Sequence, residues 1–143
     1  MDYQIYRATI ATGASAVSAI ERLQKGQWVE TNLSQNGKYV IPMKNGSTLS
    51  VYIPAAIDGT DLRFLTTYDP YLLSPVVAGD VEGTAIGLAS VDAWVSKCRT
   101  CPAELLSRAY FEPSLTNTSG VAQTQSQTTY LIFVLKAPTR PGA

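Results

Sequence analysis

Hydrophobic and polar residues alternate at several places along the chain, which is the pattern of strands that bury one face. Residues 3–10 alternate in this way, with Tyr6, Ala8 and Ile10 on one of the two faces. They should form the first strand. Residues 62–68 are also expected to form a strand.

Three strand-like runs follow one another between residues 27 and 54. They are separated by two Asn-Gly dipeptides, at 36–37 and 45–46. Asn-Gly fits a type I′ hairpin turn, because both residues tolerate positive φ. In the run at 48–53 the apolar residues share one face and the polar residues share the other. The pattern predicts a three-stranded antiparallel meander over 27–54, with an inner side and a polar side.

The last long apolar run of the chain covers residues 128–136 and has the length of a strand. A continuous apolar run of this length is typical of a strand that is buried on both faces. We therefore expect 128–136 to be a central strand of the sheet.

Helical spacing of apolar residues occurs at 14–25, where Gly26 follows as a candidate C-cap. This predicts a helix that lies on the sheet. Short helices are also expected around 90–109, with Ser90 as an N-cap and Pro102 in the first turn of the second helix.

These elements predict an α+β, mostly β fold with an antiparallel sheet of about six to seven strands. Residues 1–137 should form a single globular domain, since a chain of 143 residues fits one core. Residues 138–143 are expected to be a C-terminal tail. Residues 116–127 carry no charge and almost nothing apolar, which predicts a flexible polar loop. The segment 69–83 fits either a loop or a short helix.

Composition removes several classes of function. The chain has no histidine, so it has no imidazole to act as a general base or to bind zinc, and we expect no metal and no cofactor. Its 11 basic and 11 acidic residues cancel, which argues against binding to nucleic acid. Neither a signal-peptide pattern nor an apolar run of membrane-spanning length occurs. We therefore expect a soluble protein, cytoplasmic or part of a virion, without membrane contact.

Two cysteines, Cys98 and Cys101, are three residues apart at a place where a helix is expected to start. Such a pair forms a reversible disulfide when the helix N-terminus stabilises one thiolate. With Val91, Asp92 and Trp94 upstream, the stretch resembles the Val-Asp-x-Trp-x-x-x-Cys-x-x-Cys stretch of thioredoxins. The resemblance implies that Cys98 is the attacking thiol and Cys101 the resolving one. The alternative is a pair of structural, partly buried thiols.

Tyrosines supply the other candidate site. Tyr39 and Tyr52 are expected on neighbouring strands of the meander, and Tyr68 and Tyr71 surround an Asp-Pro turn. Aromatic side chains of this kind bind ligands or protein partners by stacking, with the hydroxyl groups supplying orientation. The alternative is cross-strand pairing that only stabilises the sheet.

Carboxylate pairs occur at 58–61 and 80–82. The first pair is expected to accept hydrogen bonds from nearby backbone N–H groups in a turn. The second pair lies in a glycine-rich stretch, where a turn and a cation site are the two alternatives.

Three functions remain open. The first is a non-enzymatic structural subunit that assembles into a homo-oligomeric particle, for example a capsid, decoration or tail component of a virus or phage. It rests on the missing histidine chemistry and on the low charged fraction of the chain, 15% of its residues, which favours association with copies of itself or with other structural proteins. The second is a β-rich module that binds a small ligand or protein through exposed tyrosines. The third is a thiol-disulfide redox protein.

Overall fold

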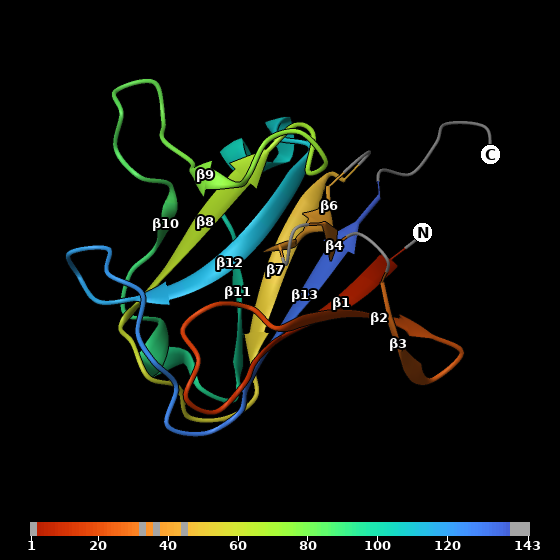
Figure 1. The fold of residues 1–143 in the computed structure, drawn as a ribbon, viewed down its shortest axis with the longest axis vertical. Helices are drawn as coiled ribbons and strands as arrows, with labels where there is room; N and C mark the ends of the chain where they lie inside the picture. The colour runs from red at the N-terminus through yellow and green to blue at the C-terminus, as the bar shows by residue number, and fades with distance from the viewer. Residues whose placement is uncertain (1–2, 32–33, 36–37, 44–45, 138–143) are drawn as a thin grey trace.

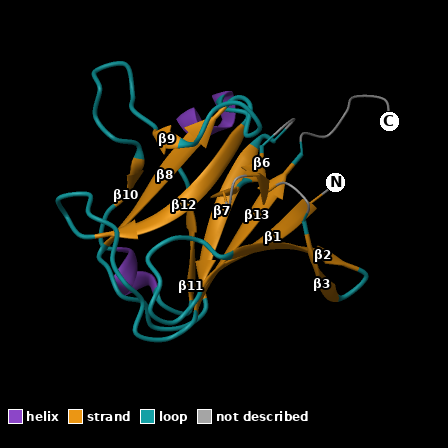
Figure 2. Ribbon diagram, viewed as in Figure 1, coloured by secondary structure: helices purple, strands orange, loops and turns teal. Residues whose placement is uncertain are grey.

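The fold is mostly β and has two larger antiparallel sheets and almost no helix (Figures 1 and 2). The structure is a computed structural model that describes residues 3–31, 34–35, 38–43 and 46–137. The first sheet has six strands in the order β11-β7-β13-β1-β2-β3. Their bounds are β1 (Tyr3–Ile10), β2 (Ala19–Gln24), β3 (Gln27–Glu30), β7 (Thr48–Ile53), β11 (Lys97–Thr100) and β13 (Thr129–Lys136).

The second sheet has five strands around the long pair β8 and β12. β10 and β9 both pair with β8, while β6 pairs with β12. The strands are β6 (Ile41–Pro42), β8 (Asp61–Thr67), β9 (Val76–Val77), β10 (Gly87–Leu88) and β12 (Tyr110–Thr116). A separate hairpin pairs β4 (Ser34–Gln35) with β5 (Lys38–Tyr39), and two short 3-10 helices are η1 (Val91–Trp94) and η2 (Ala103–Ser107).

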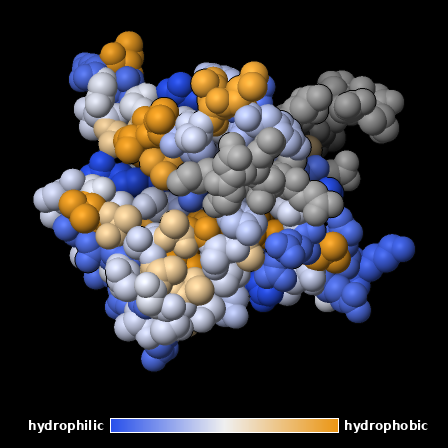
Figure 3. All heavy atoms as spheres, in the orientation of Figure 1, coloured by the Kyte–Doolittle hydropathy of each residue, from blue (hydrophilic) through white to orange (hydrophobic). Residues whose placement is uncertain are grey.

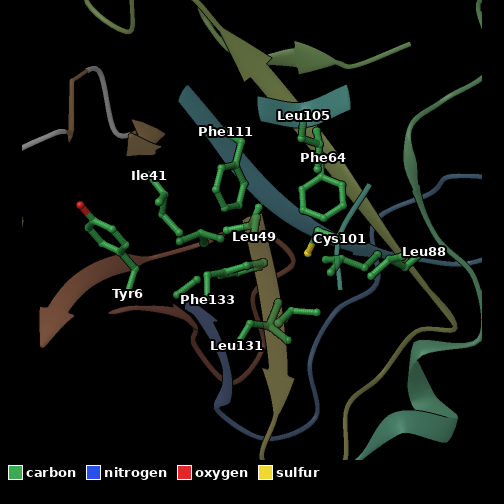
Figure 4. Close-up of a cluster of buried hydrophobic side chains, with 14 of the residues drawn as sticks. Tyr6, Ile41, Leu49, Phe64, Leu88, Cys101, Leu105, Phe111, Leu131 and Phe133 are labelled. Carbon is green, nitrogen blue, oxygen red and sulfur yellow. The ribbon is translucent and has the colours of Figure 1, made fainter. Parts of the chain in front are cut away.

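The core lies between the two sheets. Phe133 of β13 meets Phe64 of β8 and Phe111 of β12 in edge-to-face contacts, with ring centroids 5.0–6.5 Å apart (Figure 4). All three rings are fully buried. Because these rings come from both sheets, they join the sheets into one sandwich.

β13 holds the central position that the apolar run at 128–136 predicts. It pairs with β1 along its whole length and with β7 on the other side. Phe133 and its alternate neighbours are buried against the core, while Ile132 and Val134 on the opposite face are half-buried. The strand is therefore central within its sheet, and its outer face is only partly covered.

The prediction of a helix at 14–25 is wrong, because the structure has the strand β2 over Ala19–Gln24. β2 pairs with β1 on one side and β3 on the other. Lys25 and Gly26 both have positive φ and connect Gln24 to its partner Gln27 as a two-residue hairpin. Gly26 thus serves a tight turn instead of a helix C-cap, and pairing with β1 outweighs the local helical spacing.

The predictions of a single sheet and of a three-stranded meander over 27–54 are also wrong, because the strands of this range are divided between different sheets. Within this range β3 pairs with β2, β6 with β12, and β7 with β13 and β11. The hairpin expected at Asn36-Gly37 does have paired strands on both sides, namely β4 and β5. The dipeptide itself, Asn45 and the predicted tail at 138–143 lie outside the described residues.

Around 90–109 the structure has two 3-10 helices with the strand β11 between them. Ser90 does occupy the N-cap position of η1, but its φ is 56° and its side chain makes no capping hydrogen bond. β11 pairs with β7 and places the residues from Lys97 to Thr100 at the edge of the six-stranded sheet. Edge pairing therefore takes the place of the predicted helix.

The connection between β12 and β13 includes most of the predicted loop 116–127. Gln125 is only 1% exposed. Its Oε1 accepts hydrogen bonds from the Asp58 amide (3.0 Å) and the Thr129 hydroxyl (2.8 Å). Its Nε2 donates to the carbonyls of Asp58 (2.8 Å) and Gln123 (3.1 Å). The connection is thus attached to the 54–60 loop through Gln125 and also through Ser126, whose amide donates to the Asp58 carboxylate, and the flexibility of 116–127 stays a prediction.

Candidate interaction surfaces

The outer face of the six-stranded sheet, which is turned away from the core, carries a group of apolar side chains. The strand register places Ile5 opposite Val134, Ile132 opposite Tyr52, and Leu23 opposite Trp28. Together with Pro54, Ser96, Lys97 and Ile53 they line a cavity of about 590 Å³, here called the sheet-face cavity. Open apolar hollows of this kind are places where ligands or partner side chains bind.

Arg7 organises one edge of this face. Its guanidinium lies 4.8 Å from the ring centroids of both Trp28 and Tyr130. It also donates hydrogen bonds to the Glu21 carboxylate at 2.6 and 3.0 Å. A cation between two aromatic rings is attracted to both π faces. Arg7 therefore fixes the Trp28 ring on the outer face, beside the sheet-face cavity.

The other side of the cavity lies over β7 and β11. Tyr52 is 45% exposed, and the neighbouring Cys98 thiol on β11 raises the pKa of its hydroxyl through a hydrogen bond. Lys97 is the one charged residue among the described residues that line the cavity, and its ammonium lies 5.7 Å from the Trp94 ring centroid. The cavity is thus apolar with a positive charge at its edge.

A second surface is formed by residues 68–81, here called the apolar segment. These residues connect β8 to β10 and include the short strand β9. Seven of its large apolar side chains are more than half exposed: Tyr68, Tyr71, Leu72, Leu73, Val76, Val77 and Val81. Figure 3 shows hydrophobic side chains gathered on this part of the surface, and Figure 2 shows the loop between β9 and β10 projecting from the sheets.

Hydrogen bonds hold the two turns of the apolar segment in shape. The Asp69 carboxylate accepts from the Tyr71 amide (2.9 Å), and the Asp69 carbonyl accepts from the Leu73 amide (2.8 Å). The Thr67 hydroxyl donates to the Leu73 carbonyl at 2.9 Å. The Asp80 carboxylate accepts from the amides of Glu82 and Thr84, both at 2.9 Å. The turns are therefore built so that apolar side chains point into solvent.

This geometry resolves two open points of the sequence. The segment 69–83 is a loop with the two-residue strand β9, and the short-helix alternative is wrong. Of the two carboxylate pairs, Asp80 caps its own turn, and Asp58 accepts from the Ser126 amide across the fold. The Ser126 contact lowers the pKa of Asp58.

Arg108 underlies the apolar segment. Its guanidinium donates to the Gly79 carbonyl at 3.0 Å and lies beside the Tyr68 hydroxyl at 3.5 Å. Two hollows of about 750 and 350 Å³ meet at this side chain. Arg108 thus connects the chain between η2 and β12 to both ends of the apolar segment, at Tyr68 and Gly79.

The four candidate tyrosines do not form one face. Tyr39 packs against the core, and because β5 and β7 lie in different sheets, Tyr39 and Tyr52 are not on neighbouring strands. Tyr52 lines the sheet-face cavity, while Tyr68 and Tyr71 both belong to the apolar segment. The structure therefore divides three of the tyrosines between two separate surfaces and leaves Tyr39 against the core.

Sequence reasoning missed several residues of these surfaces. Trp28 is on the outer sheet face and Trp94 is 37% exposed, and neither was among the candidate site residues. Ile132 and Val134 lie within the run that was expected to be buried on both faces. No sequence signal separates the two faces of this run, because a continuous apolar sequence shows no alternation of polar and apolar residues.

The cysteines are in a different setting from the expected one. Both are free thiols, with Cys98 exposed on β11 and Cys101 buried just after it. Burial raises the pKa of Cys101 to about 12, so this thiol stays protonated near neutral pH. Residues three apart along an extended strand point to opposite faces about 10 Å apart, beyond the Cα separation of a disulfide. No helix start is present at Cys98 to stabilise a thiolate.

Among the described residues, no cluster of three or more His, Cys, Asp or Glu side chains is placed to hold a metal ion. None of the helices in the described ranges has the length and apolar character needed to cross a membrane. A scan against protein-family models, a search of curated proteins and a search of solved structures each found no match to this chain. Its function has to be argued from its own residues.

Proposed function

We propose that this chain is a non-enzymatic assembly subunit that associates with copies of itself, and that the apolar segment is its main contact surface. The observation that carries this proposal is the group of seven large apolar side chains on 68–81, each more than half exposed. Contiguous exposed apolar groups are uncommon on monomers and mark interaction sites.

The way the segment is built supports an interaction site. Leu72 is 82% exposed, and Val81 is fully exposed at the tip of its loop. An unstructured apolar loop would lower its free energy by folding back on the sheets. The hydrogen bonds of Asp69 and Asp80 instead hold the backbone turns, so that these side chains remain in water until a partner covers them.

Composition supports the same proposal. Only 15% of the residues are charged and the formal net charge is zero, so copies of the chain repel one another weakly. The absence of histidine leaves acid-base catalysis near neutral pH without its usual side chain. A particle built from many copies, such as a viral or phage shell or tail, is the setting that we propose.

Leu72→Asp tests the proposal. We expect this variant to weaken association about tenfold or more, because it puts a charge at the centre of the contact surface. Sedimentation velocity across a concentration series measures the effect. Val121→Asp is the matched control, since Val121 is 58% exposed but lies on the β12–β13 connection. If the two variants associate equally well, the apolar segment is not the contact surface.

A second candidate function is binding of a small aromatic or apolar ligand in the sheet-face cavity. The observation that favours it is the placement of Trp28 and Tyr52 around about 590 Å³ of apolar space. The variant Trp94→Phe leaves Trp28 as the single tryptophan, so that its fluorescence reports on the cavity. Saturable quenching by anilinonaphthalene sulfonate that Tyr52→Glu abolishes would support this candidate, and unchanged quenching in Tyr52→Glu would exclude it.

A further inference from the structure

We propose that the apolar segment of one copy inserts into the sheet-face cavity of a second copy, so that the subunits associate head to tail. This inference rests on the proposed self-association and names the surface that receives the segment. The inference makes two features of the fold, a projecting apolar loop and an open apolar hollow, the two halves of one contact.

The two surfaces lie on different sheets of the sandwich. The apolar segment leaves the end of β8 and returns through β9, which pairs with β8 in the five-stranded sheet. The sheet-face cavity is on the outer face of the six-stranded sheet, with the buried Phe133 on the opposite side of the same strand as Val134. Because the core separates the two surfaces, a segment cannot fill the cavity of its own chain. A second copy has to supply it.

The shapes of the two surfaces are complementary. Leu72 and Val81, at the two turns of the segment, are its most exposed side chains, while Tyr68, Leu73, Val76 and Val77 border a hollow of about 350 Å³. The cavity volume of about 590 Å³ falls within the roughly 300–1,000 Å³ of sites that enclose a drug-sized ligand. This is enough space for the side chains of one turn, such as Tyr71 and Leu72. Trp28, fixed by Arg7, supplies a rigid wall that loses little entropy on binding.

The charges are complementary as well. The apolar segment contains Asp69 and Asp80 and no lysine or arginine. Among the described residues that line the cavity, Lys97 is the one that carries a charge. Opposite charges favour the contact between segment and cavity, whereas two segments in contact with each other would bring four carboxylates together. Charge thus favours a head-to-tail contact over a symmetric contact between segments.

A head-to-tail contact leaves one segment and one cavity free at the two ends of every short oligomer. Further copies can add at both ends, which gives a closed ring or an open filament. A symmetric contact between two segments would stop at the dimer. The proposed geometry is therefore the one that suits a subunit of a larger particle.

Two variants that block opposite partners test this inference. Leu72→Asp blocks the segment and leaves the cavity intact, while Tyr52→Glu blocks the cavity and leaves the segment intact. We expect each variant alone to associate at least about tenfold more weakly than the wild type. An equimolar mixture of the two should form a heterodimer of twice 15.4 kDa and nothing larger, because one good segment and one good cavity remain.

The controls make the same chemical changes elsewhere. Val121→Asp places a carboxylate on an exposed valine outside the segment, and Thr48→Glu places one on the outer end of β7, away from the cavity. Both controls should associate like the wild type. Near-ultraviolet circular dichroism checks that every variant is folded. If Tyr52→Glu is unfolded, Lys97→Glu replaces it, because it puts a negative charge at the cavity edge.

The outcomes separate this inference from the proposed function. If Tyr52→Glu associates like the wild type while Leu72→Asp does not, the segment is a contact surface but the cavity is not its partner, and the inference is overturned. The same conclusion follows if both variants are monomeric and their mixture stays monomeric. If the wild type itself is a monomer at all concentrations, the proposed self-association fails, and this inference fails with it.

Discussion

Gln125 shows how a single polar side chain can hold together two connections without regular structure. All four hydrogen-bonding positions of its amide are used, in contacts with Asp58, Gln123 and Thr129. The sequence gives no sign of this role, because Gln125 is one of nine polar residues among the twelve of 116–127. The turn-capping role of Asp80 was predictable, since an aspartate in a short turn bonds nearby backbone amides. The same prediction for Asp58 is wrong, because its carboxylate accepts from the Ser126 amide of a distant connection.

Asp58 makes stability depend on pH at the acid end. Its contact with the Ser126 amide lowers its pKa in the folded state, so the stabilisation is present above the ordinary aspartate pKa and is lost as the pH falls through the lowered value. We expect the wild type to be more stable than Asp58→Asn at about pH 7, with the difference vanishing near about pH 2. Urea unfolding at both pH values measures this, and a difference that does not change with pH would contradict it.

Gly87 lies so close to the neighbouring strand β8 that any side chain at this position would collide with it. A Cβ atom at Gly87 would lie 2.5 Å from the backbone oxygen of Leu62, whereas one at Gly79 would meet its nearest atoms at 3.6 Å. We expect Gly87→Ala to lower the free energy of unfolding by about 1–3 kcal/mol, because β8 and β10 must move apart. Gly79→Ala should change it by less than about 0.5 kcal/mol. If urea unfolding showed that Gly87→Ala lowers the free energy of unfolding no more than Gly79→Ala does, β8 and β10 would be able to move apart without loss of stability, contrary to this prediction.

At the scale of elements, the local pattern of apolar residues predicts a strand correctly where the pattern fits one structure only. It fails where pairing with a distant strand decides between helix and strand. Residues 3–10 alternate and form β1, and the strand-length run at 128–136 forms β13. Residues 19–24 carry apolar side chains at a spacing that fits a helix, and only pairing with β1 and the turn at Lys25-Gly26 makes them a strand. That pairing is a contact between distant residues, which a local pattern does not contain.

Phe133 and Val134 are neighbours on opposite faces of β13, and they test the orientation of that strand. Phe133→Ala should lower the free energy of unfolding by about 3–5 kcal/mol, since it leaves a hole against Phe64 and Phe111. Val134→Ala removes two methyl-sized groups from a half-buried face and should lower it by about 1 kcal/mol. Guanidinium unfolding of both variants measures the contrast, and a larger loss for Val134→Ala would reverse the assignment of the two faces.

At the scale of the whole molecule, two apolar surfaces lie on different sheets of one sandwich. The mostly β class of the fold was predictable from the sequence, but the division into two sheets was not, because the runs between 27 and 54 choose partners far away in the chain. The sheet-face cavity was unpredictable for the same reason. Its lining comes from β1, β2, β3, β7, β11 and β13, which only the sheet order brings together.

The most direct test of self-association is the solution mass of the unaltered chain, measured by light scattering over a concentration series with and without reductant. We expect the mass to rise above 15.4 kDa with concentration, and to be the same in reductant because Cys101 is buried and the contact is apolar. A mass that remains at 15.4 kDa at every concentration would contradict the central claim. A mass that rises only without reductant would assign the association to the exposed Cys98 thiol and contradict it equally.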